Sequence, residues 1–226
     1  MPAQSVRAKS RRWGQLTARA VRFLALHPRS ITQVELATEL GTSQARISQI
    51  LKLLEVEGIR TSDLTQYDQR ALMIDLYVRH FRPTVNTETL WYGLDAHHLQ
   101  VEKVSHLLAA CHTRFVVSAD AAPDFLAPWR SPTLTVIYCE EAPDLTSVGC
   151  VQAMARGEAT LIVRETPDSY LLEPWASRYE APFPMAHPLQ QIWDLHDLGG
   201  ADRIEAAERL MRRIVMTGDA SPPSSR

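Results

Sequence analysis

The stretch that decides the fold runs from residue 30 to residue 58 and reads SITQVELATELGTSQARISQILKLLEVEG. Thr32, followed three residues later by Glu35, has the pattern of a capping box at a helix start. Apolar residues recur at helical spacing on both sides of Gly41, which can end the first helix because glycine accepts a positive φ angle. The stretch therefore predicts two short helices joined by a tight turn, a helix-turn-helix.

The second helix of this pair has a polar outer face. Ala37 is small enough for the two helices to cross closely, and Ile47 and Ile50 fill their shared core. The remaining side chains are short, amide-bearing or cationic, which suits base edges and phosphates in a major groove. An ordinary helical hairpin with a solvated face is the alternative. The residues that we expect to contact DNA here are Thr42, Ser43, Gln44, Arg46, Ser48, Gln49 and Lys52.

Charge is distributed unevenly along the chain. Residues 1–60 hold ten basic and four acidic residues, and no acidic residue precedes Glu35. The rest of the chain holds 14 basic and 22 acidic residues, so its net charge is −8. This asymmetry indicates a basic module with an anionic partner, joined to an acidic module without one. We expect residues 1–12 to form a disordered basic arm that contacts phosphates through Arg7, Lys9, Arg11 and Arg12.

Length and composition set the broad class. A chain of 226 residues with 45% hydrophobic and 22% charged residues is an ordinary globular composition with room for two small domains. No apolar run approaches the ~18 residues of a membrane helix. Three cysteines are too few for a disulfide framework, and the N-terminus lacks the pattern of a secretory signal. We therefore expect a cytoplasmic protein that does not engage a membrane.

The expected N-terminal domain, residues 13–82, is a winged helix-turn-helix. A first helix over 13–27 ends before Pro28, and a helix over 71–81 closes the domain. Between them, a winged-helix protein places a β-hairpin after Gly58. No glycine occurs between Gly58 and Gly93, so we expect a short or degenerate wing.

The expected C-terminal domain, residues 83–217, has mixed α/β character, and residues 218–226 are expected to form a disordered tail. Runs rich in β-branched and aromatic residues predict strands, and periodic segments between them predict helices. The expected strands cover 88–92, 115–117, 134–138 and 160–163. The expected helices cover 95–111, 120–127, 148–155, 188–198 and 201–217. The fold class is therefore α/β (α+β) with a small sheet.

Together with residues 32–58, three C-terminal stretches carry a family resemblance. They are FVVSADAAPDFLAPW at 115–129, TLTVIY at 133–138 and HPLQQIWDLHDLGGADRIEAAERL at 187–210. Over residues 30–215 the chain resembles the AbiEi-like antitoxins of type IV toxin–antitoxin systems and their free-standing transcriptional-regulator relatives. The resemblance implies a winged-helix DNA-binding domain and an AbiEi-type α/β domain. It also implies a regulator that represses its own operon and counters a nucleotidyltransferase-like toxin.

An enzymatic alternative is disfavoured by the placement of carboxylates. A nucleotidyltransferase core needs two metal-binding carboxylates two residues apart on one strand face. The expected strand over 134–138 offers none, and the adjacent Glu140 and Glu141 would point to opposite faces of a continued strand. We therefore expect no enzyme.

A metal-sensing alternative rests on histidine and cysteine residues in and beside the expected helix over 95–111. They lack the paired short spacing of a zinc site, so we expect neither a metal nor a cofactor. These residues are His97, His98, His106, Cys111 and His112.

The sequence thus predicts a sequence-specific DNA-binding transcriptional regulator that acts as a repressor. The alternative is a protein-interaction antitoxin that neutralises a toxin and uses DNA binding only for autoregulation. The expected partners are double-stranded DNA and, through the C-terminal domain, a second copy of the chain or a cognate toxin.

Overall fold

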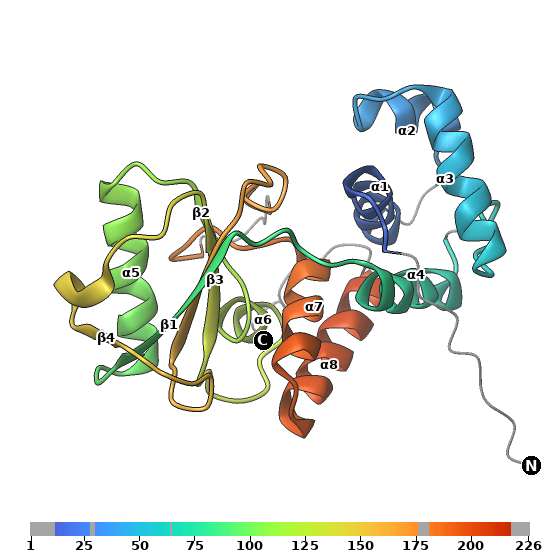
Figure 1. The fold of residues 1–226 in the computed structure, drawn as a ribbon. Coiled ribbons are helices and arrows are strands. Elements are labelled where there is room, and N and C mark those ends of the chain that lie inside the picture. Colours follow the sequence, from blue (N-terminus) through green and yellow to red (C-terminus); the bar gives the residue numbers. More distant parts are fainter. Residues whose placement is uncertain (1–11, 28–29, 64, 176–180, 218–226) are drawn as a thin grey trace, which may run out of the picture. The chain divides into compact units, whose positions relative to one another are not determined.

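The computed structural model describes residues 12–27, 30–63, 65–175 and 181–217 (Figure 1). Two compact units divide the chain. Unit 1 comprises residues 1–25 and 29–82, and unit 2 comprises residues 26–28 and 83–226. Unit 1 is helical in its described part, and unit 2 contains a five-stranded sheet with helices. The expected mixed α/β class is confirmed.

Unit 1 is built from helices that each bury apolar side chains. Leu24, Leu36, Ile47 and Met73, one from each helix, are all buried. Ile47 lies on the buried stripe of its helix, which faces the rest of the unit. The helices are α1 (Gln15–Leu26), α2 (Gln33–Glu39), α3 (Gln44–Val56) and α4 (Tyr67–His80).

The wing expected after Gly58 is not found in the described residues between α3 and α4, which form turns rather than a β-hairpin. The backbone N–H of Asp63 donates to the carbonyl of Arg60 at 2.9 Å. The backbone N–H of Arg60 donates to the side-chain Oε1 of Gln69 at 2.6 Å. A side chain of α4 thus satisfies a backbone group that a hairpin would pair with a strand. Helix α4 also begins four residues before the expected start at 71.

Unit 2 contains a mixed sheet with the strand order β2-β3-β5-β1-β4. Strands β3 and β5 run parallel, and the other neighbours are antiparallel. The strands are β1 (Thr87–Gly93), β2 (Phe115–Val117), β3 (Thr135–Cys139), β4 (Cys150–Gln152) and β5 (Leu161–Glu165).

The prediction of a helix over residues 148–155 is wrong. This segment instead contains the end of a short 3-10 helix, η1 (Leu145–Val148), followed by the edge strand β4. Gly149, with φ of 84°, ends η1 in the left-handed region, where helical hydrogen bonding stops. Val151 then pairs with Tyr92 of β1 in antiparallel register.

Helices cover both faces of the sheet (Figure 1). Helix α5 (His97–Ala110) buries Val101, Val104 and Leu108 in one cluster with Ile137 and Val163 of the sheet. Helices α7 (Pro188–Leu198) and α8 (Ala201–Thr217) lie on the opposite side, and α6 (Ala121–Leu126) packs against both. No helix in the described ranges is both long and apolar enough to span a bilayer.

Candidate nucleic-acid interface

The turn between α2 and α3 is tightly specified. At the start of α2, the backbone N–H of Thr32 donates to Glu35 Oε2 at 2.7 Å, and Glu35 N–H donates to Thr32 Oγ1, which completes the capping box. At the end of α2, Gly41 has φ of 62°, and its N–H donates to the carbonyl of Thr38. Thr42 N–H donates to the carbonyl of Ala37 at 2.9 Å. These two bonds form a Schellman motif, which fixes the direction in which α3 departs.

Helix α3 buries one stripe and exposes the opposite one. Ile47, Ile50 and Leu54 are buried, and Ser43 caps the helix by accepting from Arg46 N–H at 3.4 Å. Thr42 and Ser48 are half-buried at the margins of the exposed stripe. The structure exposes the other side chains expected to contact DNA, namely Ser43, Gln44, Arg46, Gln49 and Lys52. The helix-turn-helix residues of the expected site therefore lie together on and beside one helix.

Two exposed positions on this face were missed by the sequence reasoning. Ala45 and Val56 are both exposed. Ala45 precedes Gln49 by four residues and Val56 follows Lys52 by four, so both lie on the same exposed stripe of α3. A search for polar side chains alone passes over them. Counting positions opposite the buried Ile47 and Ile50 would have found both. An exposed methyl group at Ala45 suits contact with a thymine methyl.

The positive charge on α3 is uncompensated in its first three turns. Among the described residues, neither Arg46 nor Lys52 has a carboxylate within ion-pair distance, and Arg46 Nη1 donates to Gln49 Oε1 at 3.2 Å. The acidic residues lie at the end of the helix. Glu55 accepts from Thr61 Oγ1 at 2.7 Å, and Glu57 lies 3.8 Å from His80 Nε2. An anion would therefore meet the beginning and middle of α3 first.

Of the basic arm, Arg7, Lys9 and Arg11 lie outside the described residues. Arg12 is exposed, and its guanidinium donates to the carbonyl of Arg82 at 3.0 Å. Arg22, one of the ten basic residues among residues 1–60, is buried with 1% exposure, and its Nε donates to the hydroxyl of Tyr77 at 2.8 Å. Arg22 therefore joins α1 to α4 inside unit 1.

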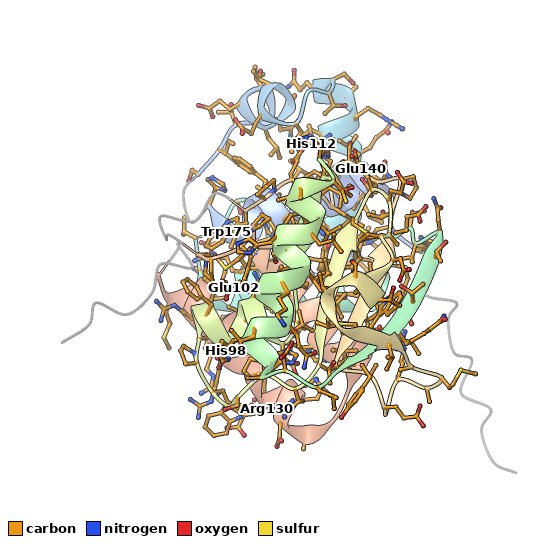
Figure 2. All side chains as sticks on the ribbon, turned by 90° about the vertical axis from the view of Figure 1, so that its left-hand side faces the viewer. His98, Glu102, His112, Arg130, Glu140 and Trp175 are labelled. Carbon is orange, nitrogen blue, oxygen red and sulfur yellow. The ribbon has the colours of Figure 1, made fainter. Side chains whose placement is uncertain are left out.

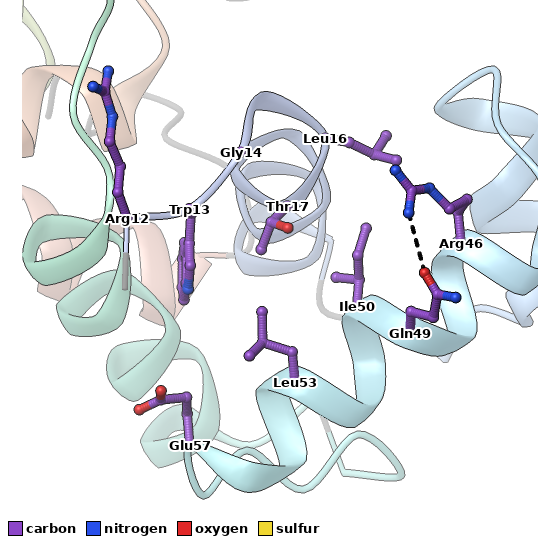
Figure 3. A pocket seen from close by; sticks show the side chains of 10 residues that line it. All are labelled: Arg12, Trp13, Gly14, Leu16, Thr17, Arg46, Gln49, Ile50, Leu53 and Glu57. Carbon is purple, nitrogen blue, oxygen red and sulfur yellow. Dashed lines mark hydrogen bonds between the residues drawn. The ribbon is translucent and has the colours of Figure 1, made fainter. Parts of the chain in front are cut away.

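A groove of about 420 Å³ lies beside α3 (Figure 3). One wall comes from the start of α1 and the other from α3. Ile50 and Leu53 project from α3 toward Trp13 and Thr17, while Arg46 and Gln49 stand at one end. The groove is also lined by Arg12, Gly14, Leu16 and Glu57.

Unit 2 holds a buried polar network between the sheet and α7. Asp194 of α7 accepts from Arg164 Nη1 and from the hydroxyl of Tyr138, each at 2.7 Å, and from Ser118 Oγ at 2.5 Å. Gln190 donates to Tyr138 at 2.8 Å. Burial raises the pKa of the Asp194 carboxyl, and Arg164 opposes that effect. Asp194 and Tyr138 have no exposed surface, so the network holds α7 against the sheet from inside unit 2.

The residues of the enzymatic and metal alternatives are dispersed. Glu140 and Glu141 are exposed just after β3, and Glu140 lies 3.4 Å from Arg114 Nη1. Figure 2 shows His98 and His112 at opposite ends of α5. Within the described ranges, no group of three histidine, cysteine or acidic residues is placed to hold a metal ion.

We compared the chain with known proteins in three ways and found no relative. No family model, no curated protein and no solved structure matches this chain. The function must therefore be inferred from the geometry of α3 and its surroundings.

Proposed function

We propose that this chain is a sequence-specific DNA-binding transcriptional regulator that represses its own operon, in the manner of the type IV antitoxins that its sequence resembles. One observation carries the proposal: the exposed stripe of α3 presents amide and cationic side chains without a carboxylate partner among the described residues. A helix of this kind fits the major groove, which is about 12 Å wide.

The roles of the side chains follow from their chemistry. The Gln49 amide has a donor and an acceptor, which match the edge of adenine. Arg46, whose Nη1 donates to Gln49, keeps further N–H groups for a guanine or a phosphate. Lys52 lies one turn further along the exposed stripe and suits a phosphate. We therefore assign base readout to Gln49 and backbone contact to Lys52.

The test compares Gln49→Ala with Lys52→Ala on DNA from upstream of the chain's own gene and on scrambled duplexes. Gln49→Ala should lose discrimination at particular base pairs, by about 1–3 kcal/mol for a bidentate contact. Lys52→Ala should weaken binding to all duplexes alike and lower the salt slope by about one. Fluorescence anisotropy at several salt concentrations measures both effects. Unchanged discrimination in a folded Gln49→Ala variant would contradict the assignment.

A second candidate function is toxin neutralisation through unit 2, and an apolar patch favours it. Tyr92 and Val151 are opposite each other on β1 and the edge strand β4, and both are exposed. Leu94 and Met154, which follow these strands, are 87% and 90% exposed. Exposed apolar side chains that face each other at a sheet edge, as Tyr92 and Val151 do, favour a protein-binding surface there. Rescue of growth from a neighbouring toxin gene by a chain that no longer binds DNA would favour this candidate.

A further inference from the structure

We propose that the groove between α1 and α3 binds a small apolar carboxylic acid in its ionised form, and that Arg46 and Gln49 hold its carboxylate. The site is concave, and its volume of about 420 Å³ falls among those of small-molecule sites, which span about 300–1,000 Å³. Its residues come from α1 and the segment just before it and from α3 and its C-cap, all within one unit, so the groove belongs to the fold of unit 1.

The floor of the groove is apolar and well supported. Trp13 is buried and stacks on His80, with ring centres 5.2 Å apart and planes inclined by 15°. Ile50 is buried, while Leu16 and Leu53 are half-buried and line the groove. A hydrocarbon or aryl group placed there would cover apolar surface that is now in contact with water.

One end of the groove is built for an anion. Arg46 is exposed, has no carboxylate partner in the described part of the chain, and is oriented by its bond to Gln49 Oε1. This bond leaves the Gln49 amide N–H groups available beside the guanidinium, so one carboxylate can accept from both side chains. Arg12 is directed elsewhere: it donates to Arg82 and points away from the groove in Figure 3.

The other end of the groove limits the charge that the ligand can carry and sets the direction in which it lies. Glu57 lies there, 3.8 Å from His80 Nε2. A second anionic group at this end would meet a like charge, so the ligand needs a single carboxylate, at the Arg46 end. An acid with one carboxylate and an uncharged apolar body satisfies both ends.

The ligand would share two residues with the DNA-reading face. Arg46 and Gln49 line the groove and also belong to the exposed stripe of α3. A carboxylate held by them competes with a phosphate or base edge for the same donors, so ligand and DNA should weaken each other's binding. This regulatory consequence rests on the proposed function, whereas ligand binding itself does not.

The ligand test titrates the full-length chain with 4-phenylbutyrate, and in parallel with the uncharged 4-phenylbutanamide, by isothermal titration calorimetry. The acid should bind about tenfold or more tightly than the amide, because the hydrogen bonds to Arg46 are charge-assisted. Arg46→Gln should remove that preference. Lys52→Gln is the matched control, since it removes one positive charge from α3 outside the groove, and it should change affinity by less than about twofold.

Gln49→Glu provides a second variant, because it places a carboxylate beside Arg46 and should weaken binding of the acid without removing the arginine. Equal binding of acid and amide, no binding of either, or insensitivity to both Arg46→Gln and Gln49→Glu in folded variants would overturn the site. Binding of the acid only after deletion of residues 2–11 would also overturn it, because the chain's own N-terminal segment would then be the occupant.

Anisotropy of a labelled duplex at constant ionic strength tests the regulatory consequence. Saturating 4-phenylbutyrate should weaken duplex binding about fivefold or more, and 4-phenylbutanamide should not. Unchanged duplex affinity would overturn the competition. If no duplex binds the chain at all, the proposed function fails, and the calorimetric titration still decides the ligand site.

Discussion

Arg164 shows how one residue can organise a whole layer of unit 2. Its side chain is 3% exposed, and it reaches Asp194 and Asp197 of α7 and Glu88 of β1 at 2.6–2.9 Å. A buried guanidinium is tolerated only when its donors are paired, because a single missing partner leaves a desolvated charge. Arg164 therefore links two strands to α7 through polar contacts inside an otherwise apolar core.

Replacing Arg164 by methionine should destabilise the chain by about 3–5 kcal/mol, because Asp194 would be left buried without its cation. Arg156→Met is the matched control. Arg156 also binds Glu88, at 2.8 Å, but its side chain is 46% exposed, so its loss should cost less than about 1 kcal/mol. Urea unfolding followed by circular dichroism measures both. Equal losses for the two variants would show that burial of the pair carries no particular weight.

His97 gives unit 2 a pH dependence. Its Nε2 lies 2.7 Å from Thr135 Oγ1. Burial lowers the pKa of His97, the charge of Asp120 opposes that effect, and His98 adds a smaller lowering contribution. The folded chain thus favours neutral His97. The associated stability is fully present above the unfolded pKa of about 6.5 and is lost as the pH falls from there through the lower pKa of the folded state.

The urea midpoint of the wild-type chain should therefore fall between about pH 7.5 and about pH 5.5 by more than that of His97→Gln, which cannot be protonated. Burial raises the pKa of Asp124, which acts in the opposite direction, but this residue is present in both proteins. The difference between the two proteins thus isolates His97. Parallel pH profiles would exclude it as the source.

The exposed residues of α3 were predictable because local spacing alone decides which side of a short helix faces inward. Arg22 was not predictable in this way. Its hydroxyl partner, Tyr77, is 55 residues away, and an arginine in a basic stretch normally lies at the surface. Ala45 and Val56 were missed for a different reason, since neither has a polar group that indicates binding.

At the scale of elements, the α2–α3 turn is the feature that the sequence predicts most completely. Its cap, its glycine and its apolar positions are all local, so one stretch of 29 residues predicts it. The predictions failed at elements whose hydrogen-bonding partners lie outside the local stretch of sequence. Strand β4 forms where Val151 pairs with Tyr92. Between α3 and α4, the described residues form turns instead of a hairpin, and Gln69 binds the Arg60 backbone there. Neither partner can be identified from periodicity.

Gly41→Ala should therefore destabilise unit 1. The φ of 62° at Gly41 is costly for a residue with a Cβ atom, so we expect a loss of about 1–2 kcal/mol. No heavy atom would obstruct the added methyl, so the cost is one of backbone conformation. Gly157→Ala is the control, because Gly157 has no positive φ and equal free space. Thermal unfolding should separate the two variants, and equal midpoints would contradict the conformational argument.

The whole molecule divides its chemistry between the two units. Residues 1–60 are net basic and include α3, whereas the remaining chain has a net charge of −8. An acidic unit is poorly suited to bind phosphates directly. If α3 reads the operator, we propose that unit 2 contributes to DNA recognition by arranging more than one copy of unit 1. Two-fold symmetric regulators use this arrangement to read paired half-sites.

A chain truncated after residue 82 tests this division of labour. It keeps α1 to α4, which belong to one compact unit and bury their own apolar side chains, so we expect a folded, monomeric domain that binds DNA weakly and with little sequence preference. The full-length chain should be dimeric by light scattering and should bind upstream DNA at least about tenfold more tightly, because two half-sites are engaged together. Light scattering and an operator titration on both proteins provide the measurements. A monomeric full-length chain that binds no better than the truncation would remove dimerisation as the role of unit 2, and its exposed Tyr92, Leu94, Val151 and Met154 would then favour a different protein partner.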